Sequence, residues 1–198
     1  MRIYWGSKDE EEKQEEKNHG KDKSDKVVTV GNRIYFYSGV DTGPILDLNK
    51  ALVELSSTLR TEFGDDAPPI KLHINSLGGY LYDAMAGIDA IHRCPVPVHT
   101  VIEGVAASAA TLMSVHGAKR FITKNSYMLI HQLSAVFWGK YEDLKDDMEN
   151  SKAFMERIRH IYRTYSEVPE DQLNEILKHD LWWDAEKCLE YKLVDAII

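Results

Sequence analysis

Short apolar runs of strand length alternate with amphipathic helical segments through most of this chain. The runs typical of strands cover residues 27–30, 33–38, 70–75, 98–103, 120–123 and 127–130, with a closing run at 194–197. Between them, apolar residues recur at helical spacing over 44–63 and 78–93. Strands that are separated by helices are typical of crossover connections. The pattern therefore predicts an α/β fold with a substantially parallel sheet.

The C-terminal part of the chain is predicted to be mostly helical. Apolar side chains keep helical spacing over roughly 25 residues from Tyr141. A helix of that length exceeds what a domain of this size needs, so we expect part of it to project and to contact a partner. Two further helices are predicted, one at 169–179 and one that begins at Asp184.

Residues 1–26 interleave acidic and basic side chains and contain little apolar surface. Such a segment cannot offset the entropy of ordering it, so we expect a disordered or mobile arm. A removable propeptide and a gating segment at a pore are the functional alternatives. The folded domain is expected to cover residues 27–198.

Charge and composition exclude several classes of protein. A net charge of −8 argues against a nucleic-acid partner. No apolar run approaches the ~18–20 residues that span a bilayer, and the N-terminal segment lacks the apolar core of a signal peptide. Cys94 and Cys188 match neither a disulfide framework nor a metal site, and we expect both in the core. These features favour a cytoplasmic protein without membrane contact, metal or cofactor.

Ser108 is the first candidate for a chemical role. It lies between paired alanines, after the run at 98–103 and at the start of an apolar helical pattern. The free amides and the dipole at a helix N-terminus favour negative charge there, which suits a nucleophile whose attack generates an oxyanion. Many serines at such positions are simple N-caps, so both interpretations stay open at this point.

Three other positions could complete a site around Ser108. His131 directly follows the apolar run at 127–130, where α/β sheets face their ligand crevice. Asp180 ends the predicted helix at 169–179, where the helix dipole disfavours a carboxylate and invites a partner such as an imidazole N–H. Gly78-Gly79 lies where a strand becomes a helix, and glycine lets backbone amides approach a ligand closely. A structural histidine and a turn glycine pair are the ordinary alternatives.

Five segments in a fixed order carry a resemblance to a known family. They read INSLGGYLYDAM, GVAASAA, GAKRF, NSYMLIHQ and DLWWDAEKCLEYKLVDAII. Together they resemble the Clp-type serine proteases, the proteolytic subunits of self-compartmented ATP-dependent proteases, over about residues 27–198. The resemblance implies the ClpP/crotonase-like α/β spiral with a projecting handle helix, assembled into stacked heptameric rings that enclose the active sites.

The resemblance also implies a role for each site residue. Ser108 matches the family nucleophile, His131 the general base and Asp180 the acid that orients the base. Gly79 and Ala109 match the residues whose backbone N–H groups form the oxyanion hole. The implied activity is a serine endopeptidase that cleaves peptides or unfolded proteins, with polypeptide substrates and no cofactor.

Some alternatives stay open beside this interpretation. Asp184 is a rival to Asp180 for the acid, although its place before a helix fits an N-cap better. The chain could be a weakly active or non-catalytic structural or regulatory ring subunit, or a phage head-maturation protease of the same chemistry. A crotonase-type acyl-CoA enzyme shares the implied fold, but such enzymes use acidic groups rather than a Ser-His-Asp set.

Two departures from the family concern partners. Family members that dock a hexameric AAA+ unfoldase use tyrosines on the strand before the glycine turn, where this chain has Lys71 and His73. We therefore expect coupling to a standard unfoldase to be weakened or changed. In the family an arginine commonly precedes the triad acid and joins an inter-ring charge pair. Lys178 and His179 stand there instead, and His179 makes the ring contact a candidate for pH sensitivity.

Overall fold

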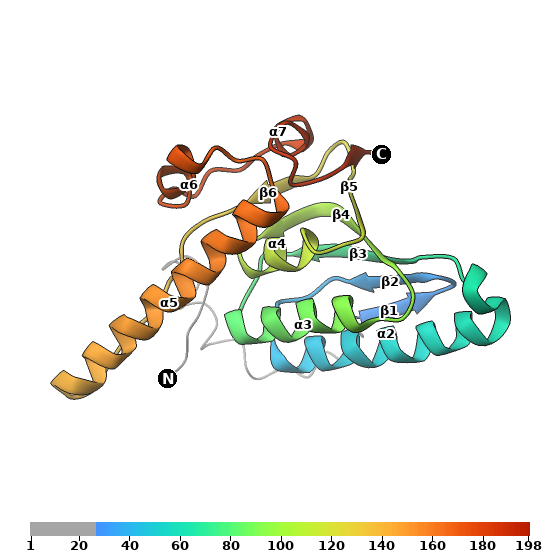
Figure 1. Ribbon diagram of the computed structural model, residues 1–198, viewed down its shortest axis with the longest axis horizontal. Helices are drawn as coiled ribbons and strands as arrows, with labels where there is room; N and C mark the ends of the chain where they lie inside the picture. The colour runs from blue at the N-terminus through green and yellow to red at the C-terminus, as the bar shows by residue number, and fades with distance from the viewer. Residues whose placement is uncertain (1–26) are drawn as a thin grey trace, which may run out of the picture.

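The structure is a computed structural model that describes residues 27–198. The predicted arm at residues 1–26 lies outside the described residues. Within the described part, seven strands form one sheet in the order β1-β2-β3-β4-β5-β7, with β6 paired to β4 (Figure 1). The strands are β1 (Val27–Val30), β2 (Arg33–Phe36), β3 (Ile70–Ser76), β4 (Val98–Ala107), β5 (Lys119–Ile122), β6 (Tyr127–Leu129) and β7 (Ala196–Ile197).

Helices cover the sheet and extend beyond it. They are α2 (Thr42–Phe63), α3 (Leu81–Arg93), α4 (Ala109–Ser114), α5 (Tyr141–Tyr165), α6 (Glu170–Ile176) and α7 (Ala185–Glu190), with a short 3-10 turn η2 (Gly64–Asp66) after α2. Figure 1 shows α2 and α3 side by side along the lower side of the sheet. In the same view α6 and α7 lie at the top of the molecule, and α5 reaches away from the body. None of the helices in the described part combines the length and apolar character needed to cross a bilayer.

The pairing of the strands confirms the predicted α/β fold. Among the strands of residues 27–198, only β1 and β2 pair antiparallel, through the Gly31-Asn32 turn between them, and the other ladders are parallel. Leu72 on β3 pairs with Ile34 on β2, and Ile74 pairs with both Phe36 and Ile102. These five side chains are almost completely buried, and apolar residues of α2 and α3 complete the core. Burial of this row provides the hydrophobic stabilisation of the sheet.

One strand is longer than its apolar run predicts, and this extension leads to the candidate site. β4 continues past Glu103 to Ala107 because its second half changes partner. The first half pairs with β5, whereas residues 105–107 pair with β6. Gly104 lies between the halves with φ of 74°, a conformation that favours glycine. The change of partner places the end of β4 directly beside β6.

The helix predicted at 169–179 is shorter than expected. α6 ends at Ile176, and the following residues form tight turns in which the Lys178 and His179 amides donate to the Glu175 and Ile176 carbonyls. Asp180 therefore lies in the loop between α6 and α7. The prediction that Asp180 ends a helix is wrong, because α6 ends four residues earlier, at Ile176.

α5 has two different halves. Its C-terminal half buries Ile158, Ile161 and Tyr162 in the core, whereas Leu144 and Met148 in its N-terminal half are exposed. The helix begins and ends where its periodicity predicts, at Tyr141–Tyr165. Its first half projects from the body, as Figure 1 shows. The prediction of a projecting helix is confirmed.

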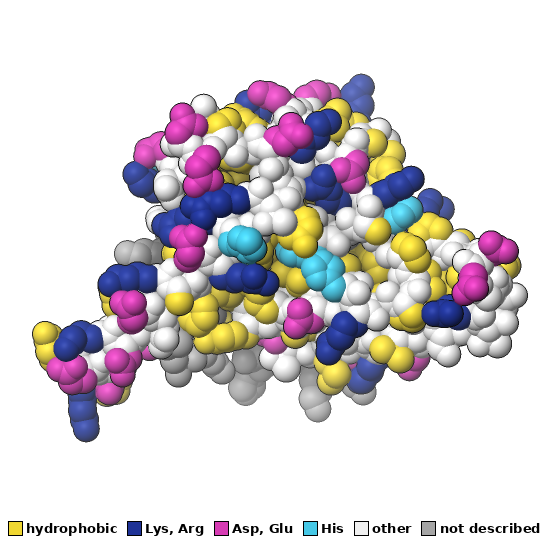
Figure 2. All heavy atoms as spheres, viewed as in Figure 1, with side chains coloured by type: hydrophobic (Ala, Val, Ile, Leu, Met, Phe, Trp, Pro, Cys, Tyr) yellow, Lys and Arg dark blue, Asp and Glu magenta, His cyan; other side chains and the backbone are white. Residues whose placement is uncertain are grey.

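A buried histidine lies where α3, α4 and α5 approach one another. The His116 ring contacts the rings of Tyr165 and His92, with centroid separations of 4.1 Å and 4.9 Å. Figure 2 shows histidine side chains among hydrophobic ones near the centre of the face drawn there. His116 Nδ1 donates to the Leu112 carbonyl at 2.6 Å, and burial lowers the pKa of His116 to about 4. The imidazole is therefore neutral at physiological pH.

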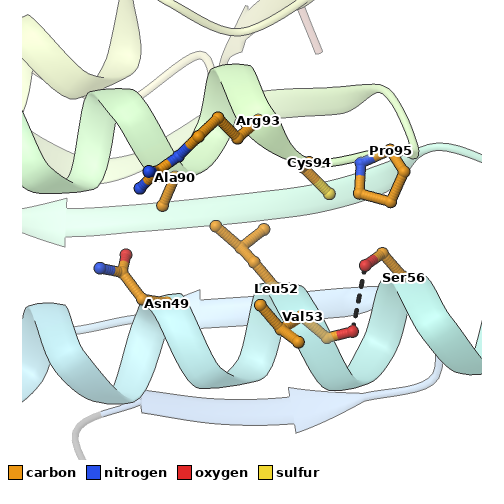
Figure 3. Close-up of a pocket in the computed structure, with 8 residues that line it drawn as sticks. All are labelled: Asn49, Leu52, Val53, Ser56, Ala90, Arg93, Cys94 and Pro95. Carbon is orange, nitrogen blue, oxygen red and sulfur yellow. Dashed lines mark hydrogen bonds between the residues drawn. The ribbon is translucent and has the colours of Figure 1, made fainter.

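The two cysteines have different surroundings. Cys188 is fully buried, as expected, and burial raises the pKa of its thiol to about 12. Cys94 is only half-buried and packs against the edge of the core, so its expected place in the core is confirmed only in part. It points into a groove of about 170 Å³ between α2 and the end of α3 (Figure 3). Partial burial also raises the pKa of this thiol, which makes it a poor nucleophile.

Candidate active site

Ser108 occupies the sharp turn between β4 and α4. Its backbone has φ of 58° and ψ of −128°, a strained conformation for a residue with a side chain. Its hydroxyl makes no capping hydrogen bond to the helix that follows, so the N-cap interpretation does not explain this serine. The Ser108 amide donates to the Leu129 carbonyl at 2.9 Å, which holds the turn against β6.

His131 lies within hydrogen-bond distance of Ser108 because β6 is the neighbour of β4. Ala107 pairs with Leu129, so the residues that follow the two strands are adjacent. His131 Nε2 is 3.0 Å from Ser108 Oγ, and both residues are more than nine-tenths buried. A neutral imidazole whose Nε2 is unprotonated can accept the serine proton across this distance.

Asp180 contacts the other nitrogen of the same ring. Its Oδ1 atom lies 2.6 Å from His131 Nδ1. A carboxylate accepts only, so Nδ1 carries the proton and Nε2 is the unprotonated nitrogen that faces the Ser108 hydroxyl. The Asp180 side chain is 59% exposed, whereas that of His131 is 10% exposed. The carboxylate therefore reaches in from a surface loop to a largely buried ring.

Backbone hydrogen bonds on both sides of Asp180 anchor the loop that carries it. The Gln132 amide donates to the Leu177 carbonyl at 2.7 Å, and Met128 and Trp183 exchange two hydrogen bonds of 2.8 Å. Residues before and after Asp180 are thus tied to the segment that contains His131. These contacts position the carboxylate without a helix.

Asp184, the rival carboxylate, has a structural role in this arrangement. Its Oδ1 accepts a hydrogen bond from the Lys187 amide at 2.9 Å and caps α7. An N-cap of this kind satisfies one of the free amides at the start of a helix. The prediction that Asp184 is an N-cap is confirmed.

The Gly78-Gly79 turn packs directly against Ser108. Gly78 has φ of 99°, and a Cβ atom there would lie 2.7 Å from the Ser108 Cβ and 3.0 Å from the Ala109 nitrogen. Gly79 has φ of 154°, and a Cβ atom there would overlap the Val40 carbonyl. No side chain fits at either position. The absence of Cβ atoms is what lets the turn approach the serine.

Two backbone amides beside Ser108 are available as donors. Within residues 27–198, the N–H groups of Gly79 and Ala109 have no hydrogen-bond acceptor. The Ala109 amide is the first of α4, where helical amides lack intrahelical partners. The site thus contains a hydroxyl, an imidazole, a carboxylate and two unoccupied donors, a set of groups that can perform acyl transfer.

Sequence reasoning missed a buried pair behind Ser108. Thr111 Oγ1 lies 2.6 Å from the Ser108 carbonyl oxygen and 2.7 Å from Tyr162 Oη. Both side chains are completely buried. In the sequence, Tyr162 is simply one of the residues that recur at helical spacing after Tyr141. Its hydroxyl was the available signal, because a buried phenol needs a partner.

His73, Lys178 and His179, which the sequence singles out for contacts with partners, each pair with an acidic side chain of this chain. His73 is 7% exposed, and its Nδ1 lies 2.7 Å from Glu103 Oε1, while its ring stacks on Tyr35 at 4.6 Å. Lys178 and His179 both pair with Glu175, at 2.7 Å and 3.3 Å.

The profile of the Clp protease family matches residues 23–198. The ATP-dependent Clp protease proteolytic subunit of Streptococcus mutans is 30% identical over 161 residues, which is 79% of this chain and 82% of the relative. The corresponding subunit of Deinococcus radiodurans is 30% identical over 131 residues, 65% of this chain and 64% of the relative. Subunit 1 of Protochlamydia amoebophila is 28% identical over 181 residues, 89% of this chain and 85% of the relative.

A solved structure shares the fold. A mutant ClpP1 from Listeria monocytogenes superposes with a TM-score of 0.74 at 22% identity, and the match covers 85% of this chain and 91% of that chain. The expected ClpP-like fold is therefore confirmed.

Proposed function

This chain belongs to the Clp protease family, and we propose that it is a serine endopeptidase whose domain at residues 27–198 cleaves peptides or unfolded proteins. Membership of the family indicates a peptidase. The observation that carries the proposed mechanism is the continuous hydrogen-bonded chain from Ser108 Oγ through His131 to Asp180, with distances of 3.0 Å and 2.6 Å.

The reaction is acyl transfer in two halves. His131 Nε2 takes the Ser108 hydroxyl proton as Oγ bonds to the scissile carbonyl carbon. The imidazolium then gives that proton to the leaving amine, the C–N bond breaks, and an acyl ester remains on Ser108. Water attacks the ester with His131 again as the base, and the proton returns to Oγ as the acid product leaves.

Asp180 orients the base in both halves. Its carboxylate accepts a hydrogen bond from Nδ1–H and so selects the tautomer in which the unprotonated Nε2 faces the serine. It also stabilises the imidazolium that forms when the serine proton is taken.

The Gly79 and Ala109 amides are the proposed oxyanion donors. Ala109 directly follows Ser108, Gly79 directly follows the Gly78 that packs against Ser108, and neither N–H group has an acceptor within the described part of the chain. Preorganised donors of this kind stabilise charge that develops on the carbonyl oxygen, and losing one costs on the order of 10²–10³ in rate.

We further propose that the chain is a subunit of a stacked ring that encloses its active sites. The relatives from Streptococcus mutans, Deinococcus radiodurans and Protochlamydia amoebophila are named as proteolytic subunits of a protease. Large apolar side chains are exposed at the start of α5 and just before it, and Trp138 is 96% exposed. Surfaces of this kind on a projecting element suit contact with another copy. The proposed location is the cytoplasm.

Coupling to a standard AAA+ unfoldase is proposed to be weak. Lys71 and His73 replace the family's docking tyrosines, and His73 is committed to Glu103. Degradation of a folded substrate with a bacterial unfoldase tests this, and coupling at the level of a typical Clp protease would contradict it.

Labelling with a fluorophosphonate tests the proposed chemistry directly. The wild-type assembly should be labelled, Ser108→Ala should not, and peptide hydrolysis should fall by on the order of 10⁶. Ser114→Ala is a matched control, because Ser114 is another buried serine nearby, at the end of α4, and its hydroxyl donates to the Thr111 carbonyl. Failure to label an assembled wild-type sample, or undiminished hydrolysis by Ser108→Ala, would overturn the proposal.

A further inference from the structure

The Ser108 carbonyl and the Ala109 N–H belong to one peptide unit. The Thr111 amide and hydroxyl both approach the Ser108 carbonyl oxygen, at 3.0 Å and 2.6 Å. Because a peptide is planar and trans, the direction of its carbonyl fixes the direction of its N–H. Contacts that hold the Ser108 oxygen therefore also aim the Ala109 amide.

In the contacts that join Tyr162, Thr111 and the Ser108 carbonyl, the chemistry of the groups fixes which atom donates each hydrogen bond. A carbonyl only accepts, so the one hydroxyl proton of Thr111 is donated to Ser108. Tyr162, at 2.7 Å, must then donate its own proton to Thr111 Oγ1. Burial raises the pKa of Tyr162 well above its usual range, so the phenol stays protonated and remains a donor.

Tyr162 is itself held in place by the core. It lies in the buried half of α5, beside Ile158 and Ile161, and is completely buried. α4 is only six residues long and follows a strained residue. A fixed phenol on a 25-residue helix can hold a short helix and its first peptide in one orientation.

We propose that Tyr162 and Thr111 are positioning residues that aim and polarise the Ala109 amide as an oxyanion donor. The inference rests on the proposed serine peptidase function and adds two residues that touch neither substrate nor reacting atoms. A hydrogen bond accepted by a carbonyl makes the N–H of the same peptide a stronger donor, and the series of bonds reinforces this effect. Their contribution belongs to the transition state, because the oxyanion forms only there.

Substitutions that remove one hydroxyl at a time test the proposal. Tyr162→Phe and Thr111→Val should each lower kcat by about 3- to 30-fold and leave KM within about twofold, less than the loss of a whole oxyanion donor. Their affinity for a peptide boronate, which mimics the tetrahedral adduct, should fall by the same factor as kcat/KM. Thr111→Ser keeps the hydroxyl and should restore both quantities.

The matched control is Ser114→Ala. Ser114 Oγ donates to the Thr111 carbonyl at 3.0 Å, so this variant loses a buried hydroxyl from the same helix without touching the Ser108 peptide. Its kcat and boronate affinity should match the wild type. Tyr162→Phe should cause little further loss when Thr111 is already valine, because the two hydroxyls act in series.

The possible results separate this inference from the proposed function. If Ser108→Ala is inactive but Tyr162→Phe and Thr111→Val keep wild-type kcat and boronate affinity, the inference is wrong and the peptidase stands. If Ser114→Ala loses as much kcat as they do, or Thr111→Ser fails to restore it, the pair is merely structural and the inference is again wrong. Hydrolysis that survives in Ser108→Ala would instead reject the peptidase.

Discussion

Asp180 and His131 are joined by a 2.6 Å hydrogen bond although 49 residues separate them in the chain. The carboxylate is more than half exposed, so water screens much of its charge. Its main effect on the ring is therefore to fix which nitrogen carries the proton.

Replacement of Asp180 by asparagine should lower kcat by roughly 10⁴, because the amide can stabilise the wrong imidazole tautomer. Asp184→Asn is the matched control, because asparagine also caps helices well and Asp184 is bonded to the Lys187 amide. Peptide hydrolysis by the two purified variants measures the difference. An equal loss of activity in Asp184→Asn would count against the assignment of Asp180.

Gly78→Ala should abolish most activity without unfolding the chain. Its Cβ would lie 2.7 Å from both the Ser108 Cβ and the Ala107 carbonyl oxygen, so the serine turn must shift. We expect kcat to fall by about 10² or more, since misplacement of about 1 Å has such effects. Gly31→Ala is the control, because Gly31 has φ of 58° with no atom within 4 Å of its added Cβ. It should cost about 1 kcal/mol of stability and leave kcat intact. Wild-type kcat in Gly78→Ala would show that the turn tolerates a side chain.

Charges on the projecting half of α5 should disrupt the proposed ring stacking. Leu144→Glu combined with Met148→Glu places two carboxylates on an exposed apolar surface. Sedimentation velocity should show a smaller assembly, because burial of unpaired carboxylates in an interface is costly. Leu144→Met with Met148→Leu keeps the apolar surface and should keep the wild-type assembly. An unchanged sedimentation coefficient in the glutamate variant would remove this half of α5 from the interface.

Stability should fall with pH below about 6.5 through His116. Its folded pKa of about 4 lies below the value of an unfolded histidine, so the unfolded chain binds the proton first as the pH falls. The contribution of neutral His116 is complete above about pH 6.5, and about 3 kcal/mol should be lost on approaching pH 4. Denaturant unfolding from pH 7 to pH 4 measures this slope.

His116→Asn keeps a donor near the Leu112 carbonyl but does not titrate, so its slope should be shallower. The same replacement of exposed His160 serves as the control and should leave the slope unchanged. A wild-type slope in His116→Asn would assign the pH dependence to other groups.

Local patterns were sufficient for most of the secondary structure. The ends of α5 follow its apolar periodicity, and the first hairpin follows its Gly-Asn turn. The end of α6 could not be predicted in this way. The Leu177 carbonyl accepts a hydrogen bond from the Gln132 amide instead of from an amide further along its own segment, so the helix does not continue. Such a contact depends on a strand far away in the sequence and leaves no local pattern.

The sequence by itself determined the order of strands and helices, the kinds of side chain available for chemistry, and the family, through motifs that follow one another in a fixed order. Only the tertiary structure decided that Asp180 rather than Asp184 reaches His131, and that Tyr162 stands behind Ser108. The physical reason is that periodicity and capping act between residues a few positions apart. Contacts across 49 or 51 residues exist only once parallel strands have paired and loops have been anchored against them.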